Sequence, residues 1–191
     1  MNELLDTGGK ILPTDEANLY KSGIYLFMDT VTSDSCKEAI EFVLKQNIEK
    51  KKQKRLQFMI CSPGGAMPDC FALIDIMKGS RIPIHTVGLG CIASCGLLLF
   101  ITGEKGHRVL TPNTSILSHQ FSWGSWGKEH ELFAQVKEFE LSTERMIDQY
   151  KKCTGLDEEK IRKFLLPPED RWLSAKEAKK LGICDSVKSV Y

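Results

Sequence analysis

The pattern of hydrophobic and polar positions over residues 23–61 predicts a strand, a helix and a second strand. Residues 23–28 (GIYLFM) and 56–61 (LQFMIC) are short, almost uninterrupted apolar runs, as in buried strands. Between them, over residues 34–46, apolar residues recur on one helical face: Cys36, Ala39, Ile40, Val43 and Leu44. A strand, a helix and a strand in this order predict a parallel βαβ unit.

The same alternation continues along the chain. After an SPGG turn, the pattern predicts a helix over residues 69–78, a strand over residues 82–88 and a second helix that starts at Ser94. The first half of the chain is therefore expected to be α/β.

Further elements are predicted in the second half. Two short strands at residues 107–110 and 115–119 flank turn-forming residues, which brings His119 to a strand end. Residues 128–152 have a long, charged helical pattern whose thin apolar stripe needs a partner surface. The members of this stripe are Leu132, Val136, Phe139, Met146 and Tyr150.

A capping box near the C-terminal end predicts one more helix. Ser174 and Glu177 have the required spacing ahead of AKKLG, where Gly182 supplies a stop. Asp170 is expected in the loop just before this helix.

Length and composition favour one domain over residues 1–191. Hydrophobic residues make up 42% and charged residues 27%, which argues against disorder, collagen-like repeats and a coiled-coil rod. The formal net charge of +1 gives no reason to expect a polyanionic partner.

The N-terminal sequence lacks the basic start and long apolar run of a signal peptide, so we expect a cytoplasmic protein. The most apolar stretch, residues 91–101, is too short to cross a bilayer. Seven cysteines, an odd number scattered within apolar segments, predict reduced thiols rather than a disulfide framework.

Two segments carry residues suited to nucleophilic catalysis. A serine hydroxyl needs a nearby base and a third group that fixes the tautomer of that base. Ser94 lies in GCIASCG, where small residues allow close approach at the start of an apolar helix, and SPGG at residues 62–65 allows a backbone N–H to point into a cleft. Taken alone, the serine also fits a tight-packing position and SPGG fits an ordinary turn.

Three longer motifs carry a family resemblance: ICSPGGAM, GCIASCGLLLFITGEKGHRVLTPNTSILSHQ and EDRWLSAKEAKKLGICDSV. In order and separation they resemble the Clp protease proteolytic subunit, over residues 23–187. The resemblance implies that Ser94 is the nucleophile, His119 the general base and Asp170 the residue that orients the base.

The resemblance also implies an oxyanion hole formed by the backbone N–H groups of Gly65 and Cys95. Substrate peptides would lie by β-augmentation between two extended segments that begin near Ala66 and Phe121. The implied substrate-binding residues are Gly64, Ala66, Met67, Gln120 and Phe121. No cofactor is implied.

At the level of architecture, the resemblance implies an α/β, crotonase-like fold of repeated β-β-α and βαβ units. Residues 1–22 would form an axial segment and the first helix, and residues 122–152 a protruding handle region. Handles would join two seven-membered rings into a closed tetradecameric chamber. The implied substrates are unfolded polypeptides, delivered in an ATP-dependent manner by an AAA+ unfoldase.

The chain departs from the family pattern at Cys95, where methionine is usual, and at Phe121, where proline is usual. Only 22 residues precede the first expected strand, fewer than the axial loop and first helix of the family occupy, which bears on gating and unfoldase docking. We hypothesise a divergent member of the family, encoded by a phage or another mobile element.

Metal and nucleic-acid sites are not expected. His85, His107 and His130 could join Cys91 and Cys95, but their spacing is not that of a zinc finger. The basic run at residues 50–55 has no interleaved aromatic residues and is typical of a solvated loop. A membrane partner is not expected either.

Three other functions stay open at this point. A catalytically silent ring subunit would keep the fold without activity. A crotonase-type acyl-CoA hydratase or isomerase would share the backbone oxyanion device but use carboxylates. A viral prohead protease of similar fold would act without an unfoldase.

Overall fold

The computed structural model describes residues 14–49, 53–120, 122 and 124–190. Phe121 and most of the expected N-terminal axial segment lie outside these residues. In chain order the described elements are α1 (Thr14–Lys21), β1 (Ile24–Phe27), α2 (Ser33–Ile48), β2 (Leu56–Ser62), α3 (Met67–Gly79), β3 (Ile84–Ala93), α4 (Cys95–Ile101), β4 (Arg108–Leu110), β5 (Ser115–Ser118), α5 (Glu129–Thr154), α6 (Glu158–Phe164), β6 (Arg171–Ser174), α7 (Ala175–Lys180) and β7 (Ser186–Val187).

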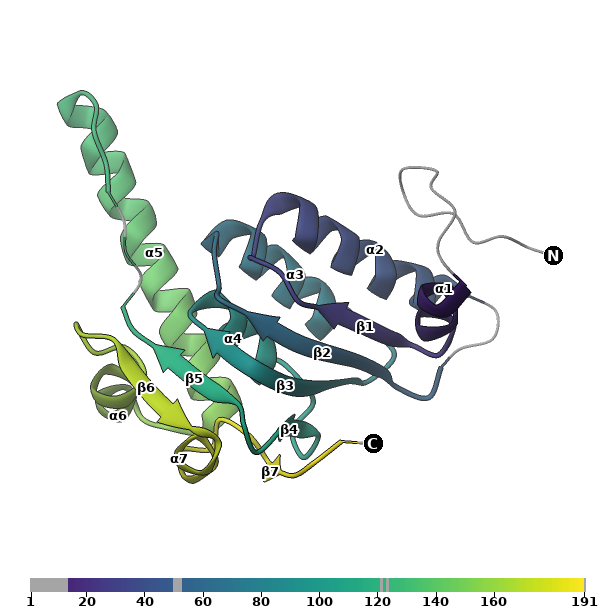
Figure 1. Cartoon of the computed structure of the whole chain (residues 1–191). Coiled ribbons are helices and arrows are strands. Elements are labelled where there is room, and N and C mark those ends of the chain that lie inside the picture. The colour runs from purple at the N-terminus through teal and green to yellow at the C-terminus, as the bar shows by residue number, and fades with distance from the viewer. Residues whose placement is uncertain (1–13, 50–52, 121, 123, 191) are drawn as a thin grey trace.

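The predicted βαβ units are confirmed. Strands β1, β2 and β3 pair in parallel, and helices α2 and α3 lie side by side on one face of this part of the sheet (Figure 1). Aromatic side chains fill the layer between helix and sheet: the rings of Phe42 and Phe58 meet edge to face with centroids 5.8 Å apart, and Tyr25 packs on both. Burial of these large rings is a main source of stability for the layer.

Capping side chains fix where two helices begin. Thr32 caps α2, accepting from the Ser35 N–H while the Ser35 hydroxyl accepts from the Thr32 N–H. The capping box predicted for α7 is confirmed, since the Ser174 hydroxyl accepts from the Glu177 N–H and the Glu177 carboxylate accepts from the Ser174 N–H.

Strand β3 is longer than predicted and changes partner along its length. Up to Gly88 it pairs with β4, and from Cys91 to Ala93 it pairs with β5. A Cβ on Gly88 would lie 2.3 Å from the Ile92 side chain, and Gly90 has a φ of +56°, so the bend between the two halves requires glycine. This bend directs the end of β3 toward β5.

Strand β5 lies between β3, which it pairs in parallel, and β6, which it pairs antiparallel. The ends of β3 and β5 and the start of β6 therefore meet at one edge of the sheet. β6 was not predicted, and it separates Asp170 from α7, where the sequence suggested only a loop.

Helix α5 packs on the body with its C-terminal half and extends away from it with its N-terminal half (Figure 1). Met146, Ile147 and Tyr150 are buried, whereas Phe133 and Val136 are 68% and 41% exposed. Among the described helices, α5 included, none combines the length and the apolar character that a membrane span requires.

A buried ion pair joins β4 to the C-terminal segment. Arg108 is 2% exposed, and its Nη2 atom lies 2.7 Å from Oδ1 of Asp185. Asp185 also accepts from the N–H groups of Gly106 and Arg108. Burial alone would raise the pKa of Asp185, but the hydrogen bonds and charge of Arg108 outweigh it and lower the pKa.

Candidate active site

Ser94 occupies a strained turn between β3 and α4. Its φ of +49° and ψ of −122° make it the one non-glycine residue with positive φ in the described part of the chain. Its N–H donates to the carbonyl oxygen of Leu117 on β5, and its own carbonyl accepts from the Leu97 N–H. Such strain clusters at functional sites, and a sharp strand-to-helix turn holds a nucleophile out from the sheet.

The pairing of three strands brings the three candidate residues to the same edge. Ala93 of β3 pairs with Leu117 of β5, and Ser118 of β5 pairs with Arg171 of β6. Each candidate is the next residue beyond these pairs: Ser94 directly follows β3, His119 directly follows β5 and Asp170 directly precedes β6. The ladder register therefore gathers residues that are far apart in the sequence.

His119 and Asp170 are in contact. The His119 Nδ1 atom lies 3.9 Å from Asp170 Oδ1, within ion-pair range but longer than a hydrogen bond. His119 is 22% exposed and Asp170 is 67% exposed. Within the described residues, no hydrogen bond joins the Ser94 hydroxyl to His119. Catalytic hydrogen bonds are often long before substrate binds.

Hydrogen bonds on both sides of His119 fix its backbone. The Ser118 hydroxyl donates to the Leu165 carbonyl, and the Gln120 N–H donates to the Pro167 carbonyl at 3.1 Å. Because both acceptors lie just upstream of Asp170, the same contacts hold that carboxylate near the imidazole.

The double-glycine turn is clamped by Val31, a residue that sequence analysis missed. The Val31 N–H donates to the Gly64 carbonyl and the Val31 carbonyl accepts from the Ala66 N–H, both at 2.8 Å. This parallel bridge uses the N–H and C=O of Val31 but not those of Gly65. The N–H and C=O of Gly65 therefore point to the side of the turn away from Val31. That side faces the start of α4, since the Gly65 carbonyl accepts from the Cys95 thiol at 3.2 Å.

Neither glycine of this turn has room for a side chain. A Cβ on Gly64 would lie 2.7 Å from Ser94 Cβ and 3.0 Å from the Cys95 nitrogen, and one on Gly65 would lie 2.2 Å from the Val31 carbonyl oxygen. Both also have positive φ, +93° and +150°. The glycines therefore let the turn approach the Ser94 region closely.

Cys95 turns its thiol inward. Its sulfur lies 3.3 Å from Met67 Sδ, and the residue is 1% exposed, whereas Ser94 is half-buried. A hydrogen bond with Cys70 lowers the pKa of the Cys95 thiol against the opposing effect of burial, and a hydrogen bond with the Gly65 backbone lowers it further. Of the two neighbouring side chains, that of Ser94 is therefore the more accessible. The Cys95 N–H belongs to the first turn of α4, where backbone N–H groups have no acceptor within the helix.

The prediction of an extended segment after the double glycine is wrong. Helix α3 begins at Met67, directly after Ala66, because Pro68 suits the first helical turn and Asp69 complements the positive end of the helix. Gly64 and Ala66 line the turn beside Ser94. Gln120 is exposed next to His119, and the second expected segment begins at Phe121, outside the described residues.

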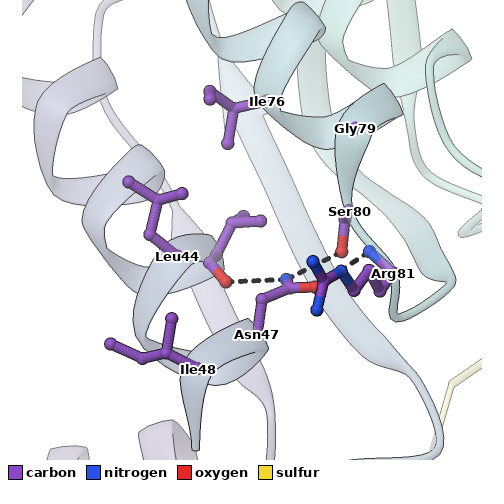
Figure 2. Close-up of a pocket in the computed structure, with 8 residues that line it drawn as sticks. Leu44, Asn47, Ile48, Ile76, Gly79, Ser80 and Arg81 are labelled. Atoms are coloured by element: carbon purple, nitrogen blue, oxygen red, sulfur yellow. Dashed lines mark hydrogen bonds between the residues drawn. The ribbon is translucent and has the colours of Figure 1, made fainter.

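A separate surface pocket lies between the C-terminal ends of α2 and α3 (Figure 2). Asn47 spans it, donating to Ser80 at 2.9 Å and accepting from the Arg81 N–H. These residues precede β3, so the pocket is at the opposite edge of the parallel strands from Ser94. Among the described residues that line it, none is a nucleophile paired with a base.

Three side chains that can ligate a metal, those of His85, Glu104 and His107, also lie close together in the structure. This grouping differs from the one considered in the sequence, which combined histidines with Cys91 and Cys95. The three residues lie near the start of β3, away from the candidate triad at its end.

Comparison with known proteins shows the family of the chain. A family model described as Clp protease matches residues 10–190. The chain belongs to the Clp protease family. A curated relative, the ATP-dependent Clp protease proteolytic subunit 3 of Rhizobium meliloti (strain 1021), is 28% identical over 172 residues, which are 90% of this chain and 86% of the relative. Membership of the Clp protease family supports peptidase activity in general, and the mixed α/β architecture agrees with the fold of that family.

Proposed function

We propose that this chain is a serine endopeptidase that hydrolyses unfolded polypeptides as the proteolytic subunit of an ATP-dependent Clp-type protease. The observation that carries the proposal is the convergence of Ser94, His119 and Asp170 at one sheet edge, each one residue beyond a paired strand. Family membership supports the reaction class.

The geometry of the imidazole supports a role for each of the three residues. Nδ1 of His119 faces Asp170, which leaves Nε2 for the serine. The carboxylate favours the tautomer with a proton on Nδ1, so Nε2 carries the lone pair that accepts the Ser94 proton. The serine oxygen then bonds to the carbonyl carbon of the scissile peptide.

The negative charge that develops on the carbonyl oxygen needs preorganised donors. We assign these to the N–H groups of Gly65 and Cys95, since the Val31 clamp turns the Gly65 peptide toward the start of α4. Removal of one such donor typically lowers kcat by about 10²–10³-fold.

The rest of the cycle uses the same groups. The imidazolium of His119 gives its proton to the leaving amine, which breaks the peptide bond and leaves an acyl group on Ser94. Water then attacks the ester, with His119 accepting the water proton and returning it to the serine oxygen. Asp170 holds the imidazole in its orientation throughout.

Self-association into stacked seven-membered rings is part of the proposal. Exposed apolar side chains on and before the projecting half of α5, namely Trp126, Phe133 and Val136, support a role for this helix as a handle that meets other copies. A chamber of this kind would restrict hydrolysis to threaded chains supplied by an AAA+ unfoldase in the cytoplasm.

A catalytically silent ring subunit is the second candidate. The observation that favours it is the 3.9 Å separation of His119 and Asp170, together with an aspartate that is 67% exposed. Such a carboxylate orients the base weakly, unless packing between subunits covers it.

Hydrolysis of a short fluorogenic peptide by the assembled protein separates the two candidates. We expect turnover that Ser94→Ala lowers by at least about 10⁴-fold. The matched control Ser115→Ala, at the opposite end of β5, should retain native activity. Absence of turnover in the assembled native protein would favour the silent subunit.

A further inference from the structure

Two histidines and a glutamate form a cluster at the start of β3 that the proposed peptidase reaction does not use. The rings of His85 and His107 stack with centroids 3.9 Å apart and planes 4° apart. The Nε2 atom of His85 lies 3.4 Å from Oε2 of Glu104. One donor atom from each of the three residues lies within 4.8 Å of the other two.

Backbone hydrogen bonds hold this cluster together independently of the side chains. The Glu104 N–H donates to the Ile84 carbonyl at 2.8 Å, and the His107 N–H donates to the Glu104 carbonyl at 2.9 Å. The Thr86 N–H donates to the His107 carbonyl at 3.3 Å. The turn that links α4 to β4 is thereby fixed against β3, on either side of His85.

The spacing and the chemistry of these donors suit a metal ion. Metal–ligand bonds of about 2.0–2.2 Å place the ligand atoms of a tetrahedral zinc site about 3.3–3.6 Å apart. Because the two rings are stacked, side-chain rotation has to turn their in-plane lone pairs toward one ion. Two imidazoles with one carboxylate suit Zn²⁺, Co²⁺ and Ni²⁺, whereas Mg²⁺ and Ca²⁺ prefer oxygen ligands alone.

The surroundings of the three side chains also fit a metal site. Partial burial, followed by the nearby His107, lowers the pKa of His85. Glu104 is 47% exposed and His107 is exposed, which leaves an open approach and room for water as a further ligand. The Arg55 guanidinium also lowers the pKa of His85, and its positive charge weakens cation binding.

We propose that His85, Glu104 and His107 form a binding site for a divalent transition-metal ion of the zinc, cobalt and nickel class. The bound ion cross-links β3 to the turn between α4 and β4. It lies at the opposite end of β3 from Ser94 and takes no part in peptide hydrolysis. Its effect is on the stability of the chain.

Titration of the metal-stripped full chain with CoCl₂ tests the site directly. We expect one Co²⁺ per chain, with visible absorption bands of nitrogen and oxygen ligation. His107→Ala and Glu104→Gln should each weaken binding at least 10-fold. The control His130→Ala, an exposed histidine on α5, should bind as the native chain does. MgCl₂ should not compete.

Thermal unfolding provides a second readout that does not depend on activity. ZnCl₂ at about 100 times its Kd should raise the Tm of the native chain by roughly 5–10 °C and leave that of His107→Ala unchanged. Melting of each variant without metal shows whether it folds. The proposal is overturned if Co²⁺ does not bind, if the cluster variants bind as tightly as the native chain, or if a thiolate-to-cobalt charge-transfer band shows that cysteines are the ligands.

Discussion

The Nδ1 atom of His119 lies 3.9 Å from Oδ1 of Asp170, at the edge where β5 ends and β6 begins. His119 directly follows Ser118 and Asp170 directly precedes Arg171, and Ser118 and Arg171 form the last pair of an antiparallel ladder. Their proximity is therefore set by the pairing of the backbone. How strongly Asp170 orients the His119 ring depends on how much water reaches the carboxylate.

Replacement of Asp170 measures how much its carboxylate contributes to catalysis. Because the carboxylate is 67% exposed, Asp170→Asn should lower kcat/KM by about 10²-fold, less than the roughly 10⁴-fold loss seen when such an aspartate is buried. The neighbouring exposed carboxylate gives a matched control, and Glu169→Gln should leave peptide hydrolysis unchanged. Equal losses in the two variants would contradict a specific role for Asp170.

The double-glycine turn should not tolerate a methyl group. Gly65→Ala places a Cβ 2.2 Å from the Val31 carbonyl oxygen and demands a φ of +150°, so the turn must shift away from Val31 and the Gly65 N–H loses its position beside α4. We expect kcat to fall at least about 10²-fold, as when one oxyanion donor is lost. Gly79→Ala meets no atom within 4 Å and should leave kcat unchanged, with equal or slightly higher stability in urea unfolding.

Replacement of Cys95 distinguishes a role of its backbone N–H from a role of its thiol. If the N–H of this residue is the oxyanion donor, Cys95→Ala should keep kcat within about threefold of the native value. Loss of the buried sulfur should cost about 1 kcal/mol in the free energy of unfolding. A loss of activity as large as that of Ser94→Ala would assign the chemistry to the thiol instead.

The buried ion pair between Arg108 and Asp185 should dominate acid sensitivity of the C-terminal segment. Because the pKa of Asp185 is lowered in the folded chain, its stabilising effect is complete above the unfolded pKa of about 3.9 and is lost as the pH falls through the folded pKa. Arg108→Met leaves the carboxylate unpaired and should lower the free energy of unfolding by about 3 kcal/mol at pH 7.

Two further variants test that assignment by urea unfolding. Arg108→Met combined with Asp185→Asn should recover part of the loss, since no buried charge remains. Lys137→Gln removes an exposed ion pair with Glu140 and should change stability by less than about 0.5 kcal/mol. A similar effect of Lys137→Gln and Arg108→Met would contradict the account.

Assembly should depend on the exposed apolar side of α5. Phe133 is 68% exposed, and Phe133→Glu should shift the protein to smaller species in light scattering after gel filtration if this helix joins subunits. The control Lys137→Glu changes charge on the same helix without removing apolar area. Unchanged assembly in Phe133→Glu would exclude this surface as an interface.

The elements with strong periodicity were predictable, and those defined by tertiary pairing were not. The helix over residues 34–46 and the strand over residues 56–61 were confirmed because their patterns are long and continuous. The predicted strand ends too early because Gly88 and Gly90 interrupt the apolar pattern of β3. In the structure these glycines form a bend within one continuous strand. β6 has four residues that become a strand only by pairing with β5.

The same distinction applies to the sites. The local sequence around Ser94 fits tight packing as well as catalysis, and only the ladder register brings His119 and Asp170 to it. One missed helix did carry a signal: Asp157 caps α6 by accepting from the Lys160 N–H at 2.8 Å. The cluster of His85, Glu104 and His107 carried none, since the two histidines lie on different strands or loops.

Reaction with a fluorophosphonate probe, read by intact-mass analysis, tests the central claim most directly. An activated serine oxygen bonds to phosphorus and releases fluoride, while the serine proton is lost, so the mass of the chain rises by that of the probe less HF. We expect one adduct on the native protein and none on Ser94→Ala or His119→Ala, with Ser115→Ala labelled as the native protein is. Absence of any adduct on the assembled native protein, or an adduct that persists in Ser94→Ala, would contradict the assignment of Ser94 as the nucleophile.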